Sequence, residues 1–182
     1  MDLYKVTNPD GAPCNGGSGA WSLPTLNADG TWTPGEWREV DGPLDPCRRG
    51  LHLATRKTLL DWIGPAIWAA EVEGETIDAG DKVVARKVRL VRGFPQWNEQ
   101  SARIFAVECA ESVLHLARAE DRPTLEVALY VARCYADGEA TRNDLAAAWS
   151  AAWTAAGDAA WAAAGDAVKA AASGRLMALL ES

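Results

Sequence analysis

The sequence lacks the motifs by which many enzymes hold a phosphate, a nucleophile or a metal ion. It contains no GxxxxGKS or GxxxxGKT loop, no GxSxG elbow and no HExxH helix. Histidine is scarce, and a histidine-based triad would have to use His52 or His115, the two that are present. The four cysteines show no spacing typical of zinc ligands. We therefore expect no metal ion and no cofactor, and the absences favour a protein that is not an enzyme.

Two further absences bear on location. The cysteines have no paired spacing and no signal peptide stands before them, which is the pattern of a reducing compartment. A long hydrophobic run is also missing, because Asp158, Asp166 and Lys169 interrupt the Ala-rich stretch and alanine contributes too little to insert a helix. We expect a cytoplasmic protein without a membrane span.

An excess of positive charge is missing as well. The formal net charge is -7, and residues 1–95 hold 13 acidic and 11 basic side chains while residues 96–182 hold 12 and 7. A protein that binds nucleic acid by broad neutralisation of phosphates needs the opposite balance. The composition therefore argues against a nucleic-acid partner and leaves open a protein partner or a small ligand.

The first 46 residues are dense in Gly, Pro, Asn and Asp, which indicates turns around short strands. Trp21, Trp32 and Trp37 are scattered among them, and aromatic side chains in such loops more often pin the loop onto a core than bind a ligand. A short strand is expected at 50–54. A helix is expected to follow over 55–63, before Gly-Pro ends it.

Two strands with alternating apolar residues are expected at 67–73 and 82–92, paired antiparallel. The second strand carries basic side chains that resemble a nucleic-acid stripe. Acidic residues just upstream, Glu71 and Glu73 among them, would face these basic side chains across the pair. We interpret the charges as cross-strand pairing on a solvated face.

Three helices are expected in the second half, at about 98–119, 122–137 and 142–173 with a C-terminal extension, joined by connections short enough to make them antiparallel neighbours. The last contains an array of Ala-rich eight-residue units, a composition that strongly favours helix. The expected fold class is α+β. A small antiparallel or mixed β-sheet lobe (1–95) would be followed by a three-helix lobe (96–182) with a long Ala-rich last helix.

Trp149, Trp153 and Trp161 supply the large apolar area of this last helix. Each step of four residues advances ~40° past a full helical turn, so the row winds round the helix instead of holding one face. Different tryptophans would then meet different surfaces. We predict that these three side chains bind a partner, because large aromatics dominate binding hot spots.

The second half also carries a family resemblance. The run Cys-Ala-Glu-Ser-Val-Leu at 109–114, then Arg122-Pro123, then Ala-Asp-Gly-Glu-Ala-Thr at 136–141, resembles a bacterial helical family of immunity proteins. The resemblance covers roughly residues 98–172. It implies protection by binding a toxin or an effector.

The first half is similar to an uncharacterised domain found in phage and bacterial proteins. The likeness lies chiefly in Tyr-Lys-Val at 4–6, in Cys-Arg-Arg-Gly-Leu-His-Leu-Ala at 47–54 and in the two predicted strands. It covers about residues 1–95 and places the chain in a phage or bacterial setting.

The Gly-Leu-His-Leu-Ala strand also resembles the core of ADP-ribosyltransferases, in which this strand lines the nicotinamide pocket. That likeness implies that His52 stands where an aromatic ring stacks on nicotinamide and that Tyr4 or Lys5 faces the ribose. Glu71 or Glu73 would stabilise the oxocarbenium-like centre. Fold analogy alone does not establish such an activity.

The leading hypothesis is a non-enzymatic binding or accessory protein of a phage or bacterial conflict system, of immunity or counter-defence type. It would hold a protein partner or a small ligand at the interface of the two lobes, with Tyr4, Arg49, His52 and Trp68 as ligand-binding residues. Two alternatives stay open. One is an ADP-ribosyltransferase-like enzyme or NAD-binding relic that uses the 50–54 strand, and the other is a structural homo-oligomer assembled through the Ala/Trp helix. Catalytic candidates for the enzyme are His52, Glu71 and Glu73.

Overall fold

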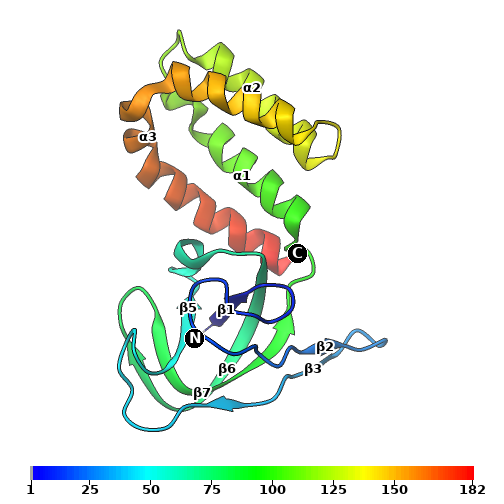
Figure 1. Cartoon of the computed structure of the whole chain (residues 1–182), viewed down its shortest axis with the longest axis vertical. Helices are drawn as coiled ribbons and strands as arrows, with labels where there is room; N and C mark the ends of the chain where they lie inside the picture. Colours follow the sequence, from blue (N-terminus) through cyan, green and yellow to red (C-terminus); the bar gives the residue numbers. More distant parts are fainter. Residues whose placement is uncertain (1) are drawn as a thin grey trace. The chain divides into compact units, whose positions relative to one another are not determined.

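The chain folds into two compact units, which we call the sheet unit (Met1–Trp97) and the helical unit (Asn98–Ser182). The computed structural model describes residues 2–182, with the backbone alone described for 153–171. The first unit is built from strands and the second from helices, so the fold class is α+β as expected (Figure 1). The expected division after residue 95 lies two residues from the observed one.

The sheet unit is organised around a five-stranded antiparallel sheet in the order β4-β7-β5-β1-β6, and β6 also pairs with β7. The sheet therefore closes on itself, because both edges of β6 are paired. A separate two-stranded ribbon joins β2 and β3 (Figure 1). The strands are β1 (Leu3–Thr7), β2 (Thr25–Leu26), β3 (Trp32–Thr33), β4 (Arg38–Glu39), β5 (Leu51–Thr55), β6 (Ala66–Asp78) and β7 (Val83–Gly93).

The long hairpin of β6 and β7 confirms the predicted antiparallel pair and extends it at the turn end. Glu71 lies opposite Arg89, with 2.6 Å between Oε2 and Nη2, and Glu73 lies opposite Lys87, with 2.9 Å between Oε2 and Nζ. The predicted cross-strand charge pairing is thus confirmed for these residues. Opposite charges that face each other across antiparallel strands stabilise the pairing.

The helix predicted over 55–63 is wrong. Thr55 is the last residue of β5, and only a short 3₁₀ turn, η1 (Leu59–Trp62), follows. The Thr58 main-chain N–H donates to the Thr55 side-chain oxygen at 3.3 Å, so these threonines form a local turn. Side-chain hydrogen bonds of this kind compete with helix formation, and few residues remain before the Gly-Pro stop.

The core of the sheet unit lies inside the closed sheet. Leu51 and Leu53 of β5 point inward, as do Val83, Ala85, Val88 and Leu90 of β7. Trp21, from the segment before β2, is only 6% exposed and joins this cluster. The predicted structural role of the loop tryptophans is therefore met by Trp21, which fixes the loop through burial of a large apolar surface.

The helical unit contains α1 (Glu99–Val113), the 3₁₀ turn η2 (Leu114–Leu116), α2 (Arg122–Ala136) and α3 (Arg142–Glu181). Capping boxes begin α1 at Asn98 and α3 at Thr141. Helix α3 packs against both α1 and α2. Arg175 near its end donates from Nη1 to the Glu108 carbonyl at 2.8 Å.

The C-terminal extension predicted after residue 173 is a continuation of helix α3, which ends at Glu181. Gly174 does not stop it, although a glycine inside a helix costs about 1 kcal/mol relative to alanine. Leu176, Met177 and Leu180 that follow are buried, and burying three such side chains outweighs this cost.

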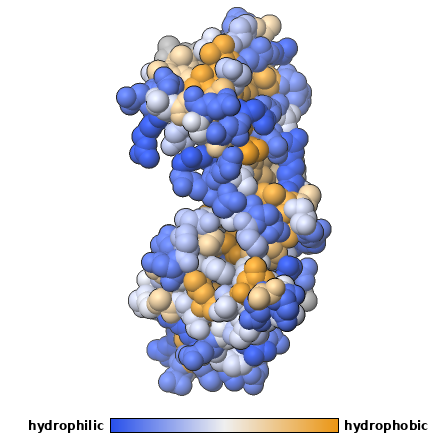
Figure 2. All heavy atoms as spheres, turned by 90° about the vertical axis from the view of Figure 1, so that its right-hand side faces the viewer, coloured by the Kyte–Doolittle hydropathy of each residue, from blue (hydrophilic) through white to orange (hydrophobic). Residues whose placement is uncertain are grey.

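Hydrophobic residues gather in patches among hydrophilic ones on the face of the molecule drawn in Figure 2. Among the side chains of the helical unit that the structure describes, four large apolar ones are exposed, namely Leu116, Val127, Tyr130 and Trp149. No helix within the described part of the chain is both long and apolar enough to cross a membrane.

Candidate functional site

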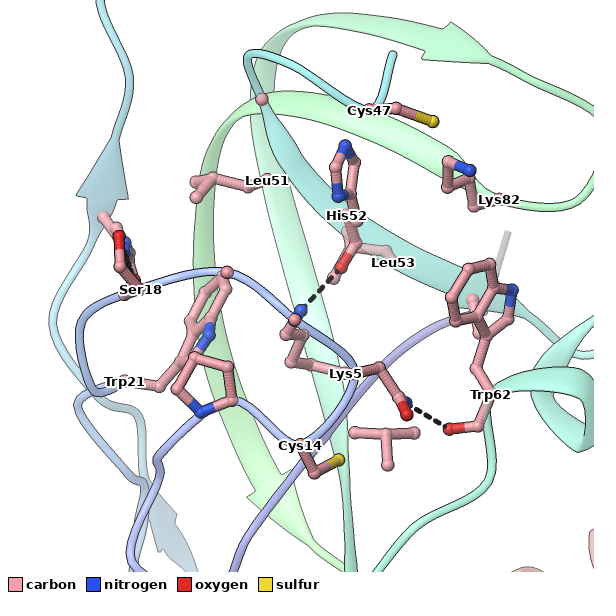
Figure 3. Close-up of a pocket in the computed structure, with 18 of the residues that line it drawn as sticks. Lys5, Cys14, Ser18, Trp21, Cys47, Leu51, His52, Leu53, Trp62 and Lys82 are labelled. Carbon is pink, nitrogen blue, oxygen red and sulfur yellow. Dashed lines mark hydrogen bonds between the residues drawn. The ribbon is translucent and has the colours of Figure 1, made fainter.

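A pocket of about 560 Å³ opens in the sheet unit, where β1, β5 and the Gly-rich loop of residues 13–18 approach one another (Figure 3). Its lining contains five cationic side chains and no carboxylate. The cations come from four separate parts of the chain: Lys5, Arg38, Arg48, Arg49 and Lys82. In a protein whose net charge is -7 this is a local reversal of sign.

The pocket lies where β1 and β5 diverge. The two strands pair over Leu3↔Thr55 and Tyr4↔Ala54, and the pairing goes no further. Beyond it, Lys5 Nζ donates a hydrogen bond to the main-chain carbonyl of His52 at 3.1 Å, in place of a main-chain partner (Figure 3). The amine is therefore positioned at the point where the ladder ends.

The Lys5 amine lies near the aromatic ring of Trp21 and the positively charged guanidinium of Arg38. Its Nζ lies 5.2 Å from the centre of the Trp21 ring, and the Arg38 guanidinium lies at the same distance from that ring. The pKa of Lys5 is lowered from 10.5 to about 8, chiefly by burial; Cys14 opposes the shift and the charge of Arg38 contributes to it. No ion pair holds the Lys5 ammonium among the described residues.

His52 contributes a neutral imidazole to the same wall. Its Nε2 atom is buried and has no hydrogen-bond partner within the described structure. Burial lowers the pKa of His52, and the charges of Lys5 and Lys82 act in the same direction. A buried polar atom without a partner is costly, so a ligand that supplies one would be favoured here.

The opposite wall is formed around Lys82 and Trp62. Lys82 Nζ lies 3.0 Å from Asp81 Oδ2 and 5.2 Å from the centre of the Trp62 ring. The hydrogen bond to Asp81 raises the pKa of Lys82. Asn15 donates to the Trp62 carbonyl at 2.8 Å, which ties the Gly-rich loop to this wall. The pocket thus holds one lysine of lowered pKa and one of raised pKa.

The arginine side of the pocket depends on close contacts with the backbone. Arg38 donates from Nη1 to the Gly19 carbonyl at 3.0 Å and from Nη2 to the Ser18 carbonyl at 2.7 Å. Arg49 lies against Gly42, since a Cβ atom built on that glycine would stand 2.6 Å from Arg49 Nη1. These contacts hold the two guanidinium groups close to the pocket.

Three of the four predicted ligand-binding residues line the pocket, namely Tyr4, Arg49 and His52. Trp68 is not among the lining residues, because its indole nitrogen donates to Thr7 Oγ1 at 2.8 Å and its ring packs against the core cluster. Whether any of them binds a ligand stays a prediction.

The predicted catalytic glutamates, Glu71 and Glu73, are exposed on the β6–β7 hairpin in ion pairs and do not line the pocket. Of the predicted partner-binding residues, Trp149 is 48% exposed on α3. The side chains of Trp153 and Trp161 lie outside the described residues.

Sequence reasoning missed most of the cations. Arg38 and Lys82 lie far apart in the sequence, so no local pattern joins them. From the sequence, the basic residues of the 82–92 strand, Lys82 included, are also interpreted as partners of the acidic residues upstream. The signal that was available is the Tyr-Lys-Val strand beside a Gly-rich loop, since a lysine in a strand with buried neighbours needs an explanation.

Comparison of the chain with protein-family models, curated proteins and solved structures gives no match. Among the residues that the structure describes, no three His, Cys, Asp or Glu side chains gather as a metal site would require.

Proposed function

We propose that the sheet unit binds a small organic anion in the cationic pocket. The single observation that carries this proposal is the lining itself, which holds five cations and no carboxylate, while the Asp81 carboxylate pairs with Lys82 from outside the lining. Like charges brought together with too few counter-charges repel one another, so folding them into one cavity is unfavourable unless an anion compensates.

The size of the pocket favours a ligand of small-molecule dimensions. Pockets for small ligands and cofactors typically enclose about 300–1,000 Å³, and a cavity of about 560 Å³ lies in this range. Arginine guanidinium groups match carboxylate and phosphate groups through paired hydrogen bonds. Arg48 and Arg49 are exposed at this site and suit such recognition.

Binding is supported over group transfer by the position of the carboxylates. An ADP-ribosyltransferase-like reaction asks for a carboxylate close to the sugar carbon. Glu71 and Glu73 instead neutralise Arg89 and Lys87 on the hairpin. We therefore favour a binding protein over the enzyme alternative.

The role in a phage or bacterial conflict system stays a proposal for the whole chain, supported by the family resemblance alone. In that role the anion pocket would be the part of the protein that senses or sequesters a small molecule. The docking role of the α3 tryptophans and the homo-oligomer are separate proposals that the pocket does not bear on.

Calorimetric titration with inorganic phosphate, pyrophosphate, citrate and AMP tests the proposal. We expect at least one of these anions to bind, and the double variant Arg48→Gln/Arg49→Gln to lose about tenfold or more in affinity for it, equivalent to about 1.4 kcal/mol. Arg92→Gln is the matched control, because Arg92 is an exposed arginine of the same unit outside the pocket. Absence of binding by every anion, or an equal loss in the control, would contradict the proposal.

A further inference from the structure

The amine of Lys5 is presented to the pocket in an unusual state for a lysine. Its Nζ is anchored by one hydrogen bond to the His52 carbonyl and faces the Trp21 ring, and no carboxylate of the described residues neutralises it. Figure 3 shows the side chain reaching into the centre of the pocket between Trp21 and His52. A surface lysine has neither this fixed position nor this partial removal from water.

We propose that Lys5 is a covalent attachment point for an anionic ligand that carries an aldehyde or ketone group. This inference rests on the proposed anion site, because the arginines of the pocket would hold the carboxylate or phosphate of the same ligand. The ligand class is therefore a small carbonyl compound with an anionic group, such as a phosphorylated aldehyde.

The reaction is an ordinary condensation. The neutral Lys5 amine attacks the carbonyl carbon, a C–N bond forms, and the carbonyl oxygen leaves as water with the two protons that the nitrogen gives up. The product is an imine, which water reverses, so no oxidant or reductant is consumed. Desolvated lysines next to another cation are the ones that proteins use for this chemistry.

The surroundings of Lys5 favour the nucleophilic form at neutral pH. With its pKa lowered to about 8, the neutral fraction near pH 7 is roughly 300-fold greater than for a lysine of ordinary pKa. The charged and titratable groups around it are Arg38 from β4, His52 from β5 and Cys14 from the Gly-rich loop. Arg38 supports the shift, and the Cys14 thiol would oppose it.

Lys82 provides an internal control within the same pocket. It is held by Asp81 at 3.0 Å, and this hydrogen bond raises its pKa. The two lysines therefore see the same ligand but differ in reactivity. A nonspecific aldehyde reaction would not distinguish them by this environment.

Reductive trapping tests the inference. The full chain is incubated with glycolaldehyde phosphate and cyanoborohydride, and the modified lysines are located by peptide mass spectrometry. We expect Lys5 to be labelled about tenfold or more faster than Lys82 and Lys87, with a rate that rises up to about pH 8 and then levels off. Glycolaldehyde, which lacks the phosphate, should label Lys5 at least about tenfold more slowly.

Lys5→Arg tests the nucleophile, because it keeps the positive charge while removing the reactive amine. We expect this variant to lose the selective adduct, while calorimetry of the wild type with the same anions reports on the binding site separately. Anion binding without a Lys5 adduct in the wild type would overturn the covalent inference and leave the binding site standing. Labelling of Lys82 equal to that of Lys5, or equal labelling by glycolaldehyde, would overturn it as well. A selective Lys5 adduct with no anion binding would instead overturn the proposed function.

Discussion

The indole nitrogen of Trp68 on β6 donates a hydrogen bond to the hydroxyl oxygen of Thr7 on β1, at 2.8 Å. Thr7 is fully buried, so the hydroxyl has little access to water as an alternative partner. The bond joins the neighbouring strands β1 and β6, in whose register Trp68 lies opposite Lys5.

Replacement of Thr7 by valine should therefore destabilise the sheet unit. The substitution keeps the shape but leaves the Trp68 donor without its acceptor, which costs about 1–2 kcal/mol. Denaturant unfolding measures the change. Trp68→Phe removes the donor, so the cost of Thr7→Val should shrink in that background, and an unchanged cost would show that the hydrogen bond contributes nothing.

Gly42→Ala should weaken anion binding by displacing Arg49. Gly42 has φ +76, and the added Cβ would stand 2.6 Å from Arg49 Nη1. Gly30→Ala is the matched control, because Gly30 has φ +83 but no atom within 4 Å of the added Cβ. Both variants should lose about 1–2 kcal/mol of unfolding free energy from backbone strain. Only Gly42→Ala should also lose affinity in the phosphate titration, by several-fold, and equal affinities would refute the role of Arg49.

Lys5 should give stability a measurable dependence on pH. Its pKa falls from 10.5 in the unfolded chain to about 8 in the folded one. Between these values the unfolded chain binds more protons, so the free energy of unfolding contributed by Lys5 rises with pH across this window. Relative to Lys5→Met, the wild type should gain about 1–2 kcal/mol from pH 8 to 10.5, less than the full shift implies because solvent screens a partly exposed group. A constant difference between the two proteins would contradict the shifted pKa.

Glu71→Gln and Glu73→Gln should leave ligand affinity unchanged. Both carboxylates sit in exposed ion pairs on the hairpin, and such pairs contribute about 0–1 kcal/mol to stability. Calorimetry and thermal unfolding of the two variants provide the measurement. A large loss of binding in either one would return these glutamates to the site and favour the enzyme alternative.

The parts of the fold that the sequence predicted are those in which local pattern and tertiary environment agree. The 67–73 and 82–92 strands alternate apolar and charged residues, and in the resulting hairpin the two strands pair antiparallel, with charged residues opposite charged residues at Glu71↔Arg89 and Glu73↔Lys87. Apolar spacing predicts the three helices, and side-chain caps begin α1 and α3, but α1 ends at Val113, before its predicted end at about 119. The end of α3 differs, because the burial of Leu176 and Leu180 depends on packing that no local signal at Gly174 reveals.

The pocket is less accessible to prediction for a geometric reason. His52 and Arg49 are near in sequence and were identified together, but Lys5, Arg38 and Lys82 meet them only because the sheet closes and β4 pairs with β7. The net charge of this pocket depends on side chains from distant segments of the chain. A short stretch of sequence therefore does not reveal it.

Trp21 has a consequence for the thermodynamics of ligand capture. Its ring lies 5.2 Å from both Lys5 and Arg38, and Arg38 is additionally fastened to two loop carbonyls. Long basic side chains usually lose rotamer freedom when a ligand arrives, at about 0.5–1.5 kcal/mol each. Here folding has already restricted them. An incoming anion would find these two cations preorganised, and the rotamer entropy that they would otherwise lose on binding has been lost before the encounter.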